Sequence, residues 1–178
     1  MSLTRRKLLG IGGMAAAAGV LGLTACNGPA PAAPARTEVF EVMRSEAQWR
    51  QLLSPAQYAV LRQQSTERAF SSPLNAEHRR GTFNCAGCAL PLFSSATKFD
   101  SGTGWPSFWA PLHGAVGEDR DTSYGMTRVG VHCRRCGGHL GHVFDDGPPP
   151  TGLRYCMNGV AMTFAPEGAS SASADKKG

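Results

Sequence analysis

The sequence lacks an apolar run of the roughly 20 residues that a membrane-spanning helix needs, and it has no strong excess of either charge. Its formal net charge is +5, but three basic residues lie at positions 5–7, and no acidic residue precedes residue 26. The rest of the chain has 15 basic and 13 acidic residues, a net charge of +2. This charge is not typical of a nucleic-acid-binding protein, so we expect no nucleic-acid partner.

The composition indicates neither long helices nor disorder. Hydrophobic residues make up 42% of the 178 residues, together with 22 glycines and 12 prolines, which is typical of a compact, loop-rich fold. Two capping boxes, Ser45 with Gln48 and Ser54 with Gln57, predict two short N-terminal helices. Pro55 suits the first position of the second helix.

From residue 81 onward the pattern changes to short apolar segments, such as 90–93, 129–133 and 160–164, separated by glycine, proline, serine and aspartate. Apolar residues in the last two of these segments alternate with a period of two, as in strands that expose one face. The sequence therefore predicts a mainly β fold of antiparallel sheets that carries short N-terminal helices.

The first 25 residues have the features of an export signal. A basic start is followed by an apolar stretch of about 15 residues and by small residues before Cys26. Arg5-Arg6 resembles a twin-arginine signal, and Leu23-Thr24-Ala25-Cys26 resembles a lipobox, whose cysteine is acylated. An uncleaved anchor is the alternative. In both cases we expect the folded body to lie outside the cytoplasm. We favour an exported protein on the periplasmic side of the cell envelope, held at the membrane by a lipid on Cys26.

The remaining chain divides into three parts by composition. Residues 26–37 form a Pro/Ala linker, which would act as an extended tether. We expect the folded domain to cover residues 38–166, and residues 167–178, rich in Ser, Ala, Gly and Lys, to be a disordered tail.

Four of the six cysteines form two Cys-x-x-Cys pairs, Cys85 with Cys88 and Cys133 with Cys136. Four thiolates in two such turns can hold Zn²⁺ in a closed tetrahedral site that stabilises the fold. Two disulfides are the alternative in an oxidising compartment. We favour structural zinc, because twin-arginine export moves folded proteins and the metal could be loaded before the thiols meet an oxidant.

Cys156 stands outside these pairs and outside the export signal. On a strand, the period of two places Arg154, Cys156 and Asn158 on one face. A thiol beside a guanidinium and an imidazole is held as the nucleophilic thiolate. We interpret Cys156 as the reactive group; a buried, inert cysteine is the alternative.

Five motifs in a fixed order resemble the B-type peptide-methionine (R)-S-oxide reductases and together cover about residues 38–166. They are Gly81-Thr82-Phe83-Asn84-Cys85-x-x-Cys88, Lys98-Phe99-Asp100-Ser101-Gly102-Thr103-Gly104-Trp105-Pro106-Ser107-Phe108, Cys133-x-x-Cys136, His139-Leu140-Gly141-His142-Val143-Phe144 and Arg154-Tyr155-Cys156-x-Asn158. The resemblance implies a zinc-clipped fold of two antiparallel sheets, a β-tent, and reduction of the R epimer of methionine sulfoxide in proteins.

This reaction gives the motif residues roles. Cys156 would attack the sulfur, leaving a sulfenic acid and releasing methionine. We expect His142, with His139, to protonate the departing oxygen. Arg154 would hold the thiolate and Asn158 would bond the oxygen.

The substrate pocket needs an apolar wall for the methyl group. We expect Trp105 and Phe108 to form it and Asp146 to orient a histidine or the arginine. A plain core position is the equal alternative for Trp105 and Phe144. A structural metal on the two histidines is disfavoured, and residues 119 and 121 read as solvated acids.

One position departs from the family pattern. Many members carry a second cysteine inside the Ser-Gly-x-Gly-Trp motif, where this chain has Thr103. With four cysteines on zinc and Cys26 acylated, no internal thiol remains to reduce the sulfenic acid. We therefore expect a one-cysteine cycle, in which a thioredoxin-like protein or another external thiol reduces Cys156 directly. We also expect a monomer.

Two other function classes remain as alternatives. A thiol–disulfide oxidoreductase would use one Cys-x-x-Cys pair and would lose dithiol exchange in Cys85→Ser. A membrane-anchored zinc-ribbon binding module would leave the grouping of Arg154, Cys156 and Asn158 without a purpose.

Overall fold

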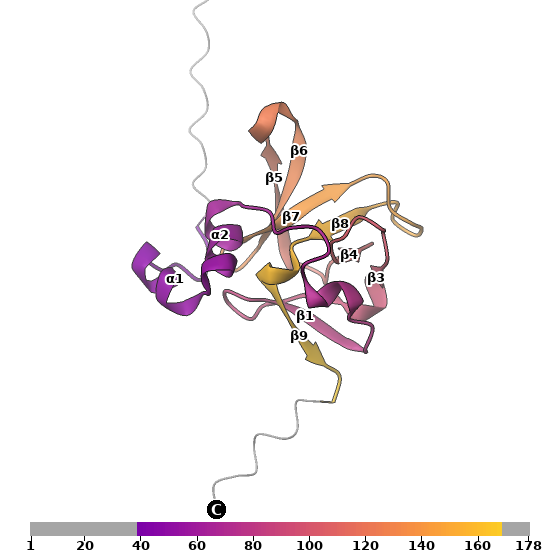
Figure 1. The fold of residues 1–178 in the computed structure, drawn as a ribbon, viewed down its shortest axis with the longest axis horizontal. Helices are drawn as coiled ribbons and strands as arrows, with labels where there is room; N and C mark the ends of the chain where they lie inside the picture. Colours follow the sequence, from indigo (N-terminus) through magenta and orange to yellow (C-terminus); the bar gives the residue numbers. More distant parts are fainter. Residues whose placement is uncertain (1–38, 169–178) are drawn as a thin grey trace, which may run out of the picture. The chain divides into compact units, whose positions relative to one another are not determined.

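The computed structural model describes residues 39–168 (Figure 1). The predicted export signal, the acylation site Cys26 and the linker lie outside the described residues, as does most of the predicted tail. Within the described part, no helix is long and apolar enough to cross a bilayer.

Two short helices, α1 (Glu46–Leu52) and α2 (Pro55–Gln63), open the fold. Each begins at a serine whose hydroxyl accepts a hydrogen bond from the backbone of a glutamine three residues later, while the glutamine side chain bonds the serine N–H. The two predicted capping boxes are thus confirmed. Trp49 from α1 and Leu61 from α2 are buried, so the helices cover part of the core.

Two antiparallel sheets make up the rest of the fold, as predicted (Figure 1). The three-stranded sheet has the order β2 (Pro91–Ser94), β1 (Gly81–Cys85), β9 (Met162–Pro166). The six-stranded sheet has the order β3 (Lys98–Phe99), β4 (Ser107–Phe108), β8 (Arg154–Met157), β7 (His139–Phe144), β6 (Arg128–Cys133), β5 (Val116–Asp121). Short 3₁₀ turns connect them: η1 (Pro73–Ala76), η2 (Ser95–Thr97), η3 (Ser123–Gly125) and η4 (Gly159–Ala161).

An aromatic cluster joins the two sheets. Phe108 of β4 stacks on Phe93 of β2 with ring centroids 4.3 Å apart, and it meets the edge of Phe83 of β1 at 4.9 Å. All three rings are fully buried. The prediction that Phe108 walls the substrate pocket is therefore wrong, because its ring fills the space between the sheets.

The methionines divide sharply by exposure. Met157, next to Cys156, is fully buried in the core, and Met162 is 4% exposed. Met43 and Met126 are 74% and 48% exposed.

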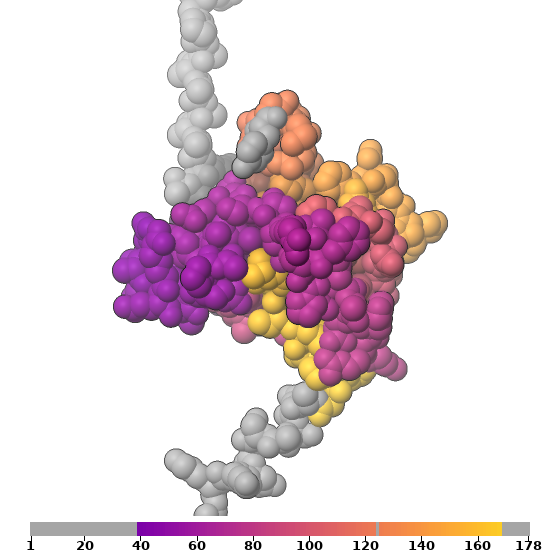
Figure 2. All heavy atoms as spheres, in the orientation of Figure 1, coloured from indigo at the N-terminus to yellow at the C-terminus, as the bar shows by residue number. Residues whose placement is uncertain are grey.

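Helices and sheets meet at η4. This turn contacts both α2 and η1. In the space-filling view, the chain around residues 159–162 (yellow) shows between the helical segment on one side and the segment around η1 on the other (Figure 2).

Candidate active site and metal site

Cys156 lies in β8, between β4 on one side and β7 on the other, and is partly exposed. It pairs with Ser107 of β4 and with His142 of β7, and residues directly opposite in antiparallel strands point to the same face. The sheet therefore presents the thiol and an imidazole side by side. A cavity of about 120 Å³ opens over them; its lining consists of Thr66, Trp105, Arg128, Gly141, His142, Phe144, Cys156 and Asn158.

Gly141 is required by the close approach of β7 to β8. A Cβ atom at this position would collide with the carbonyl oxygen of Cys156. Any side chain would push the two strands apart, so the glycine keeps His142 and Cys156 in register.

His142 is held by an acidic residue that we had interpreted as a solvated surface residue. Its Nε2 lies 2.7 Å from Oδ2 of Asp121, and Nη2 of Arg128 donates to the same oxygen at 2.7 Å. Hydrogen bonds from Ser123, followed by that of His142, hold the pKa of Asp121 well below its usual range. Asp121 ends β5 as an ionised partner of the imidazole, and the interpretation as a solvated acid is wrong.

A β-bulge brings His139 to the same face as His142. In a regular strand residues three apart point to opposite faces. The register between β6 and β7 shifts after Val131, so that His132 faces His139 and the alternation is broken once. The rings of His139 and His142 consequently meet edge to face with centroids 5.3 Å apart.

His139 is nevertheless set behind the cavity. It does not line the cavity with Cys156 but a neighbouring hollow beside Gln64 and Asp119. Burial, and then the charge of His142, lower the pKa of His139 to about 4. Its buried Nε2 has no hydrogen-bond partner among the described residues. His139 is thus a neutral ring at pH 7, and His142 is the histidine in reach of a ligand.

The neutral state of His139 predicts a pH dependence of stability. An unfolded histidine takes up a proton near pH 6.5, but folded His139 does so only near pH 4. Between these values the unfolded chain binds more protons, so the free energy of unfolding falls as the pH is lowered from about 6.5 to about 4. His139→Asn should remove up to about 3 kcal/mol of this fall. Urea unfolding of both proteins at intervals across this range, with bound metal measured at each pH, tests this; parallel curves would contradict it.

Asp121 predicts an effect on turnover. Asp121→Asn keeps the size of the side chain but removes the carboxylate that orients His142 through a hydrogen bond. We expect kcat to fall roughly 10- to 100-fold, as when the partner of a catalytic histidine is changed. Asp119→Asn, on the same strand and exposed, is the matched control and should retain activity. Equal activity of the two variants would show that Asp121 plays no part.

Arg154 is fixed by Asp146 and by an aromatic ring. Its Nε and Nη2 donate to the two carboxylate oxygens of Asp146, both at 2.8 Å, and its guanidinium lies 4.4 Å from the centroid of Phe144. The hydrogen bond to Asp146, and also the nearby Cys156, raise the pKa of Arg154. Asp146 therefore orients the arginine, one of its two expected roles, and it does not line the cavity.

Asn158 follows β8 and is buried with both ends of its amide in use. Its Oδ1 accepts a hydrogen bond from the N–H of Glu67 at 2.9 Å, and its Nδ2 donates to the carbonyl oxygen of Leu140 at 3.0 Å. These bonds indicate that the amide shapes the cavity wall and ties it to residues before the first sheet.

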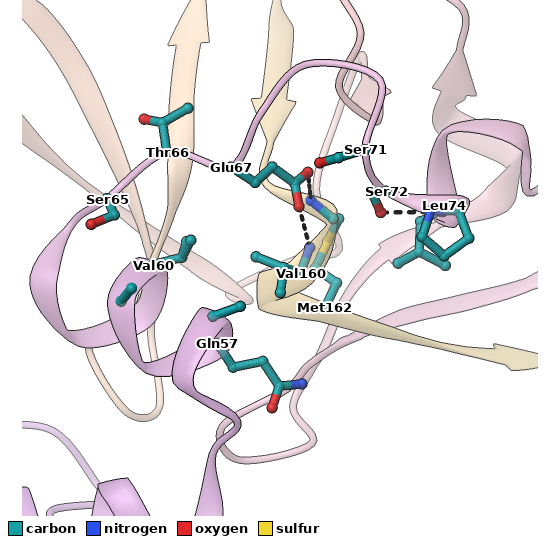
Figure 3. A pocket seen from close by; sticks show the side chains of 14 residues that line it. Gln57, Val60, Ser65, Thr66, Glu67, Ser71, Ser72, Leu74, Val160 and Met162 are labelled. Atoms are coloured by element: carbon teal, nitrogen blue, oxygen red, sulfur yellow. Dashed lines mark hydrogen bonds between the residues drawn. The ribbon is translucent and has the colours of Figure 1, made fainter.

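Glu67 continues this tie along the chain. Its carboxylate accepts hydrogen bonds from the N–H groups of Gly159 and Val160 at 2.6 and 2.9 Å (Figure 3). Its carbonyl oxygen accepts the indole N–H of Trp105 at 3.2 Å. One residue outside every motif thus connects both walls of the cavity.

Trp105 lines the cavity, and a glycine loop places it there. Gly104 has φ +93°, and a Cβ atom on it would overlap Ala69 and Phe70, so only glycine fits. Phe144 lines the cavity as well, a position that the sequence did not separate from the core.

Thr103 occupies the position at which a second cysteine would stand. Its hydroxyl lies 3.7 Å from the Cys156 sulfur. The hydroxyls continue to Ser101 at 2.8 Å and to buried Ser107 at 2.7 Å, a chain of hydroxyl groups beside the thiol.

The four remaining described cysteines meet at one point. All their sulfur atoms lie within 4.8 Å of one another, with Cys85 3.7 Å from Cys136 and Cys88 3.5 Å from Cys133. Sulfur atoms around one tetrahedral ion with bonds of about 2.3 Å are roughly 3.8 Å apart, so the group fits a metal. The thiols are unbridged. Hydrogen bonding to Cys133 and the other thiols, together with burial, raises the pKa of Cys85, and a bound cation would favour the thiolate form of the whole group.

Two residues that line the cavity, and a third that holds its walls, escaped the sequence reasoning. Thr66 and Arg128 belong to no motif, and Glu67 acts on residues more than 90 positions away. Arg128 is the first residue of β6, and its charge at the start of this strand was the one available signal.

Comparison with known proteins gives consistent matches. A family model described as the SelR domain matches residues 53–166. A peptide methionine sulfoxide reductase MsrB of Bradyrhizobium diazoefficiens is 55% identical over 138 residues, which cover 77% of this chain and 99% of that protein. Proteins of the same name are 56% identical in Thiobacillus denitrificans (125 residues, 70% and 95%) and 58% identical in Pseudomonas putida strain W619 (120 residues, 67% and 90%).

Proposed function

Since the chain belongs to the SelR domain family, whose relatives named above are peptide methionine sulfoxide reductases, we propose that it repairs oxidised proteins by reducing methionine sulfoxide to methionine. The observation that carries this function is the pairing of Cys156 with His142 beneath a cavity walled by Trp105 and Phe144. The cavity has a nucleophile, a proton donor and an apolar wall, which are the three groups that sulfoxide reduction requires.

Each step of the reaction can be assigned to a residue of the site. The Cys156 thiolate attacks the sulfoxide sulfur while protonated His142 gives its proton to the oxygen. The S–O bond then breaks, the oxygen passes to Cys156 as sulfenic acid, and methionine leaves. Asp121 stabilises the charged imidazole, Arg154 stabilises the thiolate, and Asn158 supports the wall on which the substrate rests.

We assign the R epimer as the substrate. The cavity is apolar at Trp105 and Phe144 and polar at His142 and Arg128. A sulfoxide can therefore bind in one orientation, with its methyl group toward the apolar side and its oxygen toward the polar side. With racemic dabsyl-methionine sulfoxide and a thiol reductant, conversion should stop at one half, and the remaining substrate should be the S epimer on a chiral column. Complete conversion would contradict this selectivity.

The catalytic cycle uses one cysteine. Thr103 cannot form a disulfide with Cys156, so an external thiol, thioredoxin-like or smaller, condenses with the sulfenic acid and releases water. A second thiol then frees Cys156. Mass spectrometry of the oxidised enzyme should find no internal disulfide on Cys156.

The four-cysteine group is a structural zinc site. Four thiolates without an open position are typical of zinc that stabilises a fold, and such an ion supplies no catalytic water. Cys85 ends β1 and Cys88 lies in the turn after it, while Cys133 ends β6 and Cys136 lies in the turn between β6 and β7. The ion would therefore join the small sheet to the large one.

The export signal and the lipid anchor on Cys26 remain part of the proposal. They rest on the basic and apolar pattern of residues 1–25 and on the lipobox-like end of that segment. Intact mass of the protein purified from its own membranes should correspond to a chain that begins at acylated Cys26. A mass that includes residues 1–25 would contradict cleavage.

A further inference from the structure

A second, larger hollow shares Thr66 with the cavity over Cys156. Figure 3 shows the side chains that line it. Its volume is about 550 Å³, within the range of roughly 300–1,000 Å³ that is typical of ligand sites. We call it the flanking groove. Helix α2 forms one wall, η1 and the residues before it form the other, and η4 with the start of β9 forms the floor.

The flanking groove is apolar. Val60, Leu74, Val160 and Met162 contribute side chains to it from α2, η1, η4 and β9 (Figure 3). Among the described residues that line it, Glu67 is the one with a formal charge, and its carboxylate is occupied by the backbone N–H groups of Gly159 and Val160. The groove therefore offers apolar contact and no unpaired charge to a ligand.

The flanking groove adjoins the catalytic cavity. Thr66 lines both hollows, and the chain passes from Cys156 through Asn158 directly into the floor at Val160. The cavity of about 120 Å³ is below the usual size of a ligand site and admits one side chain. The main chain that carries this side chain must continue over the surface outside the cavity, and the groove begins there.

We propose that the flanking groove binds the polypeptide next to the oxidised methionine, and that it favours extended substrate segments whose neighbouring residues are apolar and uncharged. This inference rests on the proposed function. Such segments are buried in folded proteins, so the groove would direct the enzyme to unfolded or damaged chains. The energy comes from apolar area removed from water, which the catalytic cavity alone cannot supply.

The test compares two substrates that share the reacting group. One is N-acetyl-methionine sulfoxide methylamide, which fills only the cavity, and the other is a pentapeptide with leucines on both sides of the sulfoxide. Wild-type enzyme should prefer the pentapeptide in kcat/KM. Ala59→Glu places a charge in the groove and should lower the ratio of the two kcat/KM values roughly tenfold, because a charge against an apolar side chain must lose water without a partner.

Matched variants separate charge from size. Ala59→Gln adds the same bulk without the charge and should lower the ratio less, and Ala96→Glu, exposed on η2, should leave it unchanged. A ratio in Ala59→Glu equal to that of wild type overturns the groove proposal and leaves the reductase function standing. Failure of wild-type enzyme to reduce either substrate would instead overturn the proposed function.

Discussion

Replacement of Cys156 by serine is expected to lower kcat/KM for methionine sulfoxide by roughly 10³-fold or more, since removal of a nucleophile leaves only binding and electrostatic effects. A serine hydroxyl is not ionised near pH 7 and cannot accept the oxygen as a sulfenic acid. His142, held by its hydrogen bond to Asp121, would still line the cavity. The measurement is single-turnover conversion of methionine sulfoxide by stoichiometric enzyme, where no external thiol is needed.

The same variant separates the function classes. Cys156 is remote in sequence from the four clustered cysteines and is not one of their group, so Cys156→Ser should keep the fold and the bound metal. Thr103→Val is the matched control, because it removes the hydroxyl beside the sulfur but keeps the nucleophile. Full turnover by Cys156→Ser would exclude a sulfenic acid at this residue. Retained turnover together with loss in Cys85→Ser would favour a thiol–disulfide oxidoreductase.

Loss of the metal is expected to unfold the domain or to lower its Tm by at least about 15 °C. Zinc binding to four-ligand sites contributes about 10–16 kcal/mol in small domains, which equals or exceeds the total stability of most native proteins. The residues concerned are buried, with Cys85, Cys133 and Cys136 each no more than 2% exposed. Without a cation, their thiols must be protonated and packed against one another, and the two sheets lose a common attachment.

A variant and a chelator test this in parallel. Cys133→Ala should yield protein without metal and with the lowered Tm, and wild type treated with a mercurial and a chelator should follow it. Circular dichroism gives the Tm, and atomic absorption gives the metal content. The control is Cys156→Ser that receives the same mercurial treatment but no chelator. A metal-free protein with the wild-type Tm would show that the four cysteines do not stabilise the fold.

Local sequence signals were sufficient for the two helices, for the strand at 129–133 and for the four-cysteine group, whereas segment 160–164 begins as the turn η4 before β9. A capping box such as Ser45 with Gln48 uses atoms three residues apart, and a period of two fixes the face on which Arg154 and Cys156 lie. The Cys-x-x-Cys pairs likewise predict a shared site, because each knuckle supplies two ligands whatever the fold between them.

Interactions between distant segments could not be read in this way. The bulge that brings His139 beside His142 has no local signature in the sequence, and Asp121 reaches His142 because β5 and β7 both flank β6. The alternation of side chains along a strand predicts that Phe108 faces one side of its sheet, but it does not predict which side the second sheet covers. Its position in the core follows only from the stacking of Phe93, which belongs to that second sheet.

The sharp division of the described methionines by exposure matters for an enzyme that acts on oxidised methionine. Oxidation follows exposure, so peroxide reaches Met43 and Met126 long before Met157. A polar sulfoxide at those surface positions leaves the packing under Cys156 intact, and another copy of the enzyme can reduce its R epimer. The enzyme thus tolerates oxidation of its exposed methionines, and it can reverse part of the oxidation that it repairs in other proteins.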